Sequence, residues 1–167
     1  MKKISRLILA TALSSLLLSG CSTKEEVQNP SQIAVGKKLE NVTLKDQFDK
    51  PHTLTNDTKK VIFVFQKDTG HLVKAYLNKQ PLEYMDKRAI RFIADVSPMP
   101  ALIRDYVAMP DLQKHGYPVM LITDKELAKR FKDKANEAVI TVATLDNLTI
   151  TDVKRVSTEA ELQKAID

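Results

Sequence analysis

Cysteine and glycine are both scarce in this chain. The only cysteine among the 167 residues is Cys21, so an internal disulfide and a pair of thiols for thiol–disulfide exchange are both excluded. Of the four glycines, none forms a glycine-rich loop after an expected strand. Nucleotide or flavin binding of the dinucleotide-fold type therefore lacks its main requirement, a backbone that can approach the phosphates.

The N-terminal segment has the composition of a secretory signal. Lys2, Lys3 and Arg6 form a basic head, and residues 7–18 are almost wholly apolar or small. With a rise of about 1.5 Å per residue, this apolar core is too short to cross a hydrocarbon layer of about 30 Å comfortably. We expect residues 1–20 to act as a signal and not as a membrane span.

The signal ends in Leu-Ser-Gly-Cys at residues 18–21, which resembles the lipobox of bacterial lipoproteins. That resemblance implies cleavage before Cys21, lipid on its thiol and a membrane anchor for the mature chain. Ser22 stands where lipoproteins retained in the inner membrane often carry Asp, so the expected location is the periplasm-facing envelope, at the outer membrane. The alternative is an ordinary secretory signal that happens to contain a cysteine.

Removal of the signal changes the charge and the available chemistry. The net charge of +5 falls to +2, because 23 basic and 21 acidic residues remain. We therefore do not expect nucleic-acid binding. With Cys21 acylated, no thiol is left as a nucleophile or a metal ligand. Residues 21–31 are polar after the cysteine and are expected to form a lipidated tether, and residues 32–167 a single domain.

The first half of this domain alternates strands and helices. Short strands are expected at 37–44 and 51–54, around a turn at 46–50, and a strand buried on both faces at 61–65. A helix capped by Asp68 or Thr69 should follow, with its buried face on the spacing of Leu72, Ala75, Tyr76 and Lys79 and its end before Pro81.

A further apolar strand is expected at 90–96, and a second helix from Pro98 or Pro100. Four apolar residues share one face of this helix and are predicted to be its buried stripe, with Met109-Pro110 stopping it. These residues are Leu102, Ile103, Tyr106 and Val107.

The second half predicts a strand at 119–122, an exposed charged helical segment at 124–134, and a hairpin of 139–145 with 148–156. Its Asp146-Asn147 link suits a type I′ turn. Thr158 and Glu161 form a capping box for a last helix that buries Leu162 and Ile166. Helical crossovers imply parallel strands, and the hairpin implies an antiparallel edge, hence an α/β fold with a mixed sheet.

This chain resembles thioredoxin-like domains of the redoxin and alkyl-hydroperoxide-reductase kind over residues 33–167. Residues 44–49, Leu-Lys-Asp-Gln-Phe-Asp, are similar to the N-terminal hairpin of that class, and 61–65 to the strand that leads to its active site. Residues 116–124 resemble the segment whose proline is cis and faces that site. The resemblance implies a three-layer α/β/α sandwich with a mixed central sheet and an N-terminal β-hairpin extension. The chain also resembles short bacterial envelope proteins with Asp-Gln-Phe-Asp-x-Pro near their start, a similarity that implies no activity.

The sequence departs from the family where the redox cysteines belong. The loop reads Gln-Lys-Asp-Thr-Gly-His at 66–71, and the hydroxyl of Thr69 is too weak an acid to replace a thiol. We therefore expect no oxidoreductase or peroxidase activity, no catalytic residues and no cofactor.

Two hypotheses remain for the function. The first is a non-catalytic module of the cell envelope that binds a protein or peptide in a groove between Thr69-Gly70-His71 and Tyr117-Pro118. The second is a protein that binds copper, or a small ligand, through His71 and His115, with a methionine such as Met99 or Met109. Solvent-exposed histidines with no ligand are the alternative to the second hypothesis.

Overall fold

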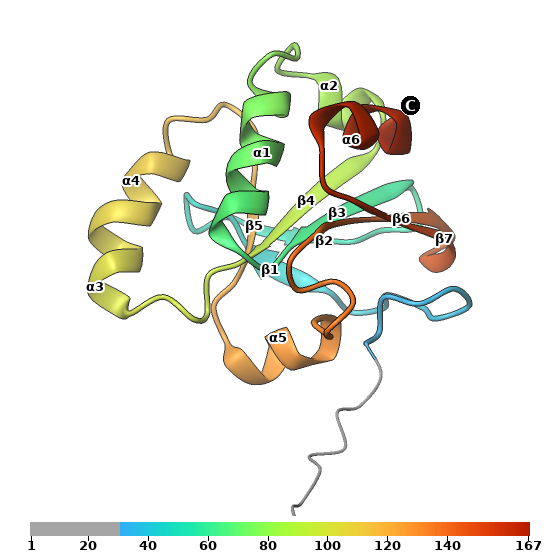
Figure 1. Ribbon diagram of the computed structural model, residues 1–167, viewed down its shortest axis with the longest axis horizontal. Coiled ribbons are helices and arrows are strands. Elements are labelled where there is room, and N and C mark those ends of the chain that lie inside the picture. Colours follow the sequence, from blue (N-terminus) through green and yellow to red (C-terminus); the bar gives the residue numbers. More distant parts are fainter. Residues whose placement is uncertain (1–30) are drawn as a thin grey trace, which may run out of the picture.

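A computed structural model describes residues 31–167 (Figure 1). The core is a five-stranded sheet in the order β5-β4-β3-β6-β7. The parallel strands are β3 (Lys60–Val64), β4 (Ile90–Asp95) and β5 (Met120–Ile122). The antiparallel strands are β6 (Ile140–Asp146) and β7 (Thr149–Val156). The mixed sheet with an antiparallel hairpin edge confirms the α/β prediction.

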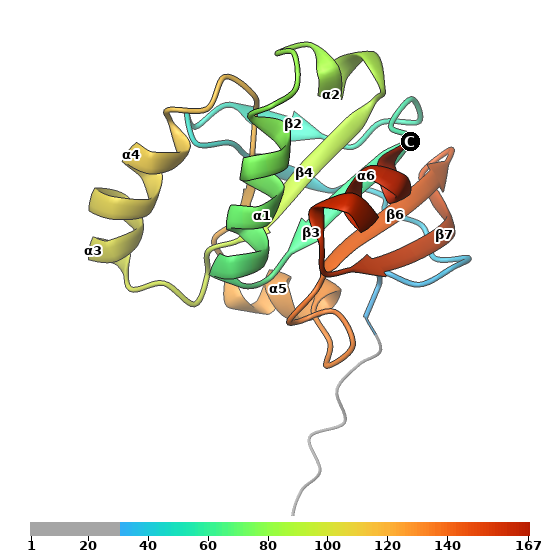
Figure 2. The same ribbon diagram turned by 45° about the horizontal axis from the view of Figure 1, so that its top comes forward.

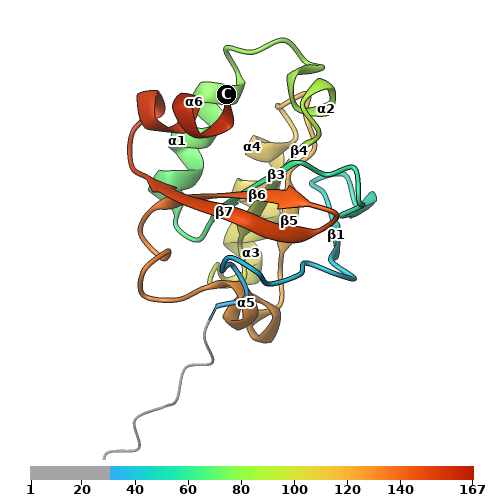
Figure 3. The same cartoon turned by 90° about the vertical axis from the view of Figure 1, so that its right-hand side faces the viewer.

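Central strand β3 is buried on both faces, as its run of β-branched and aromatic residues predicts. Ile62 and Val64 face one apolar core, and Val61 and Phe63 face the other. Helices α1 (Lys67–Leu77) and α6 (Glu159–Ile166) cover the first face, with the short α2 (Tyr84–Lys87) at its border (Figures 1 and 3). Helix α5 (Lys125–Phe131) and a two-stranded hairpin, β1 (Thr43–Lys45) with β2 (Pro51–Thr53), contribute to the second. The three layers follow from these two cores.

The start of α6 and the turn between β6 and β7 lie close to where the sequence predicts them. The capping box at Thr158 and Glu161 is present with both of its hydrogen bonds. The hairpin turn is shifted by one residue from its predicted position: positive φ angles occur at Asn147 and Leu148. Two consecutive positive φ angles are the geometry of a type I′ turn, which matches the right-handed twist of the flanking strands.

Helix α1 differs from its prediction in start and orientation. It begins at Lys67 with Gln66 as N-cap and no side-chain cap, so neither Asp68 nor Thr69 caps it. Its buried residues are Val73, Tyr76 and Leu77. The buried face is therefore rotated relative to the predicted one, and Ala75 and Lys79 are exposed.

Ser31, the last residue of the predicted tether, packs against the domain. Ser31 was expected to end the tether, but it is buried and donates a hydrogen bond to the backbone oxygen of Phe131, at the end of α5. The buried amide of Asn136 donates to the same oxygen at 2.7 Å. Ordered chain therefore enters the domain beside α5. Among residues 31–167, no helix has the length and hydropathy needed to span a membrane.

The buried side chain of Gln47 ties the N-terminal hairpin to the sheet. Its Nε2 donates to the Tyr117 oxygen at 2.8 Å, and its Oε1 accepts from the Val119 N–H at 2.8 Å. The two bonds bridge the backbone on either side of Pro118, in the chain that leads into β5. In the same hairpin, the buried Asp46 carboxylate accepts from the Phe48 and Lys50 N–H groups. These bonds and a contact with His52 lower the pKa of Asp46 although burial alone raises it.

We predict that Gln47→Leu lowers the free energy of unfolding by about 2–4 kcal/mol, because it leaves the Tyr117 carbonyl and the Val119 N–H buried without partners. Urea unfolding followed by circular dichroism measures this. Gln163→Leu, at an exposed position of α6, is the control and should change the value by less than about 0.5 kcal/mol. Equal effects of the two substitutions would show that the amide bridge is not important for stability.

Candidate functional site

The segment after β3, where the resemblance placed the redox loop of the family, forms the start of α1. Thr69, Gly70 and His71 lie in the first turns of α1 and not in a loop. The Thr69 hydroxyl donates to the Gln66 backbone oxygen at 2.9 Å. No cysteine occurs among residues 31–167. This end of α1 can offer polar contacts to a ligand, but it has no group for thiol chemistry.

The Tyr117-Pro118 segment lies away from the start of α1, contrary to expectation. Met120 pairs with Ile93, which pairs with Phe63, so Pro118 stands level with the beginning of β3. The Tyr117 hydroxyl lies 3.3 Å from the Asn78 side-chain oxygen, at the far end of α1. Strands β3, β4 and β5 are parallel, and α1 starts where β3 ends. The chain before β5 therefore lies at the opposite edge of the sheet, where the three strands begin.

Two further findings bear on the predicted groove. No peptide bond of residues 31–167 is cis, so the expected cis form of Tyr117-Pro118 is wrong. Gln47 occupies the Tyr117 oxygen and the Val119 N–H, the backbone groups that an extended peptide would need for strand-like pairing. Tyr117 itself is buried. The structure thus does not bring the two halves of the predicted groove together.

Strand β6, not β5, approaches the start of α1. Phe63 pairs with Thr141, and continuing this antiparallel register places Val139 level with Phe65. Residues 136–139 read Asn-Glu-Ala-Val and contain no proline. The position of residues 136–139 beside α1 was not predicted, because Tyr117-Pro118 before β5 matched the family pattern instead. The predicted β6–β7 hairpin was the signal that could have revealed this position. Its first strand had to pair with a central strand, which brings the chain before β6 to the start of α1.

The two histidines of the copper hypothesis lie at opposite ends of α1. His71 is exposed in its first turns, whereas the His115 Nδ1 is 2.8 Å from the Asn78 side-chain oxygen at its end. Seven residues of helix separate His71 from Asn78, or about 10 Å of rise. Residues 31–167 contain no cluster of three or more His, Cys, Asp or Glu side chains suited to a metal.

His115 has a structural environment instead. Its ring stacks on Tyr117, with 5.4 Å between ring centroids. Burial lowers the pKa of His115, and nearby Lys74 lowers it further. His52, the third histidine, bonds to Asp46 at 2.7 Å. Each ring thus has a partner within the domain.

The most unusual surface feature is an exposed apolar stripe on the helix between β4 and β5. This helix comprises α3 (Ala101–Ile103), a π-helical turn η1 (Arg104–Ala108) and α4 (Met109–Leu112). The four residues predicted to be buried are instead exposed by more than half. We call them the apolar stripe: Leu102 (71% exposed), Ile103 (51%), Tyr106 (77%) and Val107 (60%).

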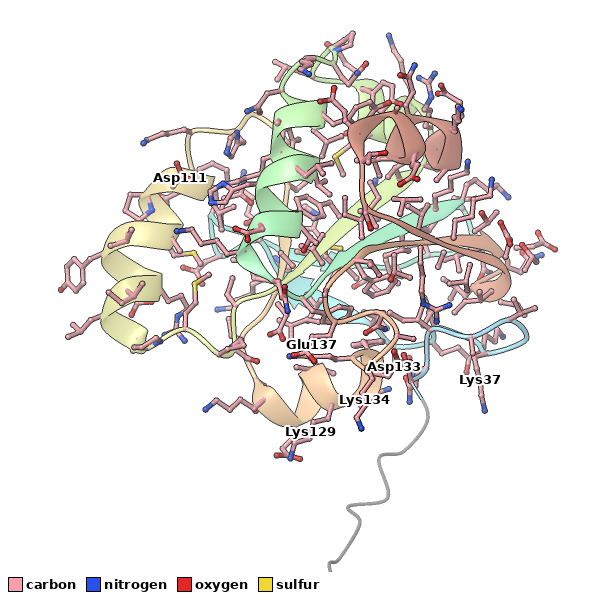
Figure 4. The ribbon with its side chains drawn as sticks, in the orientation of Figure 1. Lys37, Asp111, Lys129, Asp133, Lys134 and Glu137 are labelled. Atoms are coloured by element: carbon pink, nitrogen blue, oxygen red, sulfur yellow. The ribbon has the colours of Figure 1, made fainter. Side chains whose placement is uncertain are left out.

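The helix is held to the domain by its other side and its C-terminal end. No residue of α3 or η1 is buried, and only Leu112 of α4 is. Lys74 of α1 forms an ion pair with Asp111 at 2.6 Å, which lowers the pKa of Asp111. Figure 4 labels Asp111 on α4. Met99 and Met109 pack against the core from partly buried positions. Figure 2 shows α3 and α4 beside α1, at the border of the molecule.

Met109-Pro110 does not stop the helix as predicted. Proline lacks an N–H and its ring clashes with the carbonyl four residues earlier, here that of Tyr106. The Met109 N–H instead bonds to the Arg104 oxygen, the five-residue spacing of a π-turn. The wider turn accommodates Pro110, and π-turns are frequent at functional sites. Tyr106 and Val107 of the stripe lie within this π-helical turn.

Comparison with solved structures identifies the fold. A candidate protein disulfide isomerase from Bacteroides thetaiotaomicron superposes with a TM-score of 0.55 at 16% identity, covering 80% of this chain and 86% of the other. A peroxiredoxin-like protein from Aquifex aeolicus gives 0.51 at 12% identity, covering 83% and 88%. A candidate thiol:disulfide interchange protein DsbE from Chlorobium tepidum gives 0.51 at 11%, covering 80% and 99%. No family model and no curated protein matches the sequence.

We predict that Leu102→Gln and Tyr106→Gln change the free energy of unfolding of the monomer, measured at high dilution, by less than about 0.5 kcal/mol, because both side chains are exposed in the folded domain. Leu112→Gln, which buries a polar amide, should cost about 2–4 kcal/mol. Urea unfolding of the three variants measures this. A large loss for Tyr106→Gln would mean that the stripe packs against the domain in solution, as the sequence pattern alone suggested.

Proposed function

Starting from a thioredoxin-like fold, we propose that this protein is a lipid-anchored, non-catalytic module of the bacterial cell envelope that binds protein through the apolar stripe. The exposure of the stripe is the observation that carries the binding proposal. An apolar face of this kind is costly to leave in water and is typical of interaction sites.

The sequence supports the absence of redox chemistry. The fold neighbours include proteins described as thiol–disulfide enzymes, but at 11–16% identity they establish the fold alone. Thiol–disulfide exchange needs a thiolate, and the one cysteine of this chain precedes the domain. At the start of α1, the Thr69 hydroxyl is bonded to the helix N-cap and has no disulfide chemistry.

The stripe is a better contact surface than the groove predicted from the sequence. In the groove, Tyr117 is buried and its carbonyl is bonded to Gln47. On the stripe, Leu102 and Tyr106 are four residues apart, as are Ile103 and Val107, so two adjacent rows of apolar side chains face solvent. Tyr106 adds a large side chain of low conformational entropy, which is favourable in an interface. The copper alternative finds no support, because His71 and His115 are at opposite ends of α1.

We predict that Cys21→Ala releases the protein from the membrane, because acylation of Cys21 supplies the anchor. Wild-type protein should sediment with envelope membranes and carry fatty acyl groups detectable by mass spectrometry, and the variant should do neither. Ser22→Ala is the matched control and should remain membrane-bound and acylated. A Cys21→Ala protein that still sediments with membranes would argue against a lipid anchor.

We predict that a photocrosslinking amino acid at position 106 forms protein adducts in intact cells, because the stripe is in contact with protein there. The same amino acid at exposed position 154 on β7 is the control and should give at most a background level of adducts. Adding Leu102→Gln and Ile103→Gln should abolish the adducts formed from position 106. Equal yields from positions 106 and 154 would contradict binding through the stripe.

A further inference from the structure

Resting on the proposed function, we infer that the protein bound by the apolar stripe is a second copy of this chain, and that the two helices of residues 101–112 pair in parallel about a two-fold axis. The stripe, the charges beside it and the position of the anchored N-terminus each support this arrangement.

The size of the stripe suits a symmetric contact. An aromatic side chain alone offers about 150–250 Å² to an interface. With Tyr106 at 77% exposure and three aliphatic neighbours above half, the stripe falls among the largest patches of monomeric proteins, about 300–600 Å². Two such faces together bury on the order of 1,000 Å², the lower limit for a specific interface. A symmetric pair reaches that limit without a second surface.

Charge does not oppose the pairing of two identical faces. The four stripe residues are uncharged, and the charged residues within the same turns pair with each other: Arg104 Nε lies 2.8 Å from the Asp105 carboxylate. A second copy therefore brings apolar side chains opposite apolar side chains and no like charge to the centre. Because the stripe carries no net charge, it also lacks the basic residues with which interfacial helices bind anionic lipid.

The topology fixes where the helix points relative to the anchor. We call the sheet edge at which β3, β4 and β5 end the carboxyl edge. Helix α3 begins after β4, at the carboxyl edge, and α4 ends at the opposite edge, before β5. Helix α5 joins the end of β5 to the start of β6 and so also lies at the carboxyl edge, where Ser31 contacts Phe131. Figures 1 and 3 agree that α3 is nearer to α5 than α4 is.

This geometry selects the parallel pairing. A two-fold axis along the helix leaves both carboxyl edges, and hence both copies of Ser31, on one side of the dimer. That arrangement suits two chains anchored through Cys21 in one membrane, whereas antiparallel helices would direct the two anchors to opposite sides. Anchoring in one surface also raises the effective concentration of one copy for the other, so a small interface suffices.

The test is disulfide crosslinking in the full-length, membrane-inserted protein, where an introduced cysteine is the one unacylated thiol. Parallel pairing places each residue near its own copy, with Ile103 and Tyr106 in the middle of the stripe closest to the axis. Mild oxidation of Ile103→Cys or Tyr106→Cys should give a covalent dimer. Leu82→Cys, at an exposed apolar position outside the stripe, is the matched control and should remain monomeric.

Sedimentation of the detergent-solubilised wild-type protein gives an independent measurement. We expect a dimer, and a monomer for the Leu102→Gln/Tyr106→Gln variant. Crosslinking only between mixed Ile103→Cys and Tyr106→Cys chains would overturn the parallel arrangement. A monomeric wild type, together with Ile103→Cys and Tyr106→Cys proteins that fail to crosslink, overturns the dimer altogether, including the case in which lipid covers the stripe.

The outcomes separate this inference from the proposed function. If photoadducts from position 106 contain a different protein and no cysteine dimer forms, the dimer is wrong and binding through the stripe stands. If neither adducts nor dimers form, both are wrong. If the protein is not acylated and dimers form from Ile103→Cys or Tyr106→Cys but not from the Leu82→Cys control, which also carries Cys21, the pairing stands and the lipid anchor does not.

Discussion

The bridge made by the Gln47 amide determines how the rest of the surface can be used. By bonding to the backbone on both sides of Pro118, it fastens the N-terminal hairpin over the chain entering β5. Gln113, just after α4, donates to the Gln47 backbone oxygen at 2.9 Å, so the same residue also fixes the end of the preceding helix. The edge that related folds could offer to an extended peptide is thereby closed. The helix of residues 101–112 is held mainly at this end, which leaves its first turns exposed.

Much of the fold was predictable from the sequence because it depends on short-range chemistry. The β-branched run at 61–65 can only be satisfied by burial on both faces, and β3 is buried in that way. The capping box at Thr158 requires only residues three positions apart, and it is present as predicted. The scarcity of cysteine excludes an internal disulfide, and the lack of a glycine-rich loop argues against dinucleotide binding, whatever the fold. Such signals involve near neighbours along the chain and hold wherever the element is placed.

The failed predictions concern relations between distant elements. Periodicity showed that Leu102, Ile103, Tyr106 and Val107 share a helix face, but it contains no information on whether that face meets the domain or the solvent. The proline at 118 matched a family pattern over a few residues, yet its position depends on β5 pairing in parallel with β4 at the sheet edge. The predicted helix end at Pro110 was wrong for a local reason. A π-turn, in which the Met109 N–H bonds to the Arg104 oxygen, lets the helix continue although proline has no N–H. A sequence pattern therefore identified the residues of the stripe as one helix face but predicted the wrong environment for that face.

The absence of cysteine from residues 31–167 and the exposed helix face both bear on the proposed function. In a thioredoxin-like fold, the start of α1 is useful when a thiolate is present there, and Thr69 cannot supply one. The apolar stripe carries a cost in solubility, which a contact with protein offsets. The proposed membrane anchor favours such a contact, because confinement to one surface raises the local concentration of one copy for the other. The helix between β4 and β5 is the element that meets these conditions, since it begins at the edge where the chain enters the domain and presents its apolar residues outward.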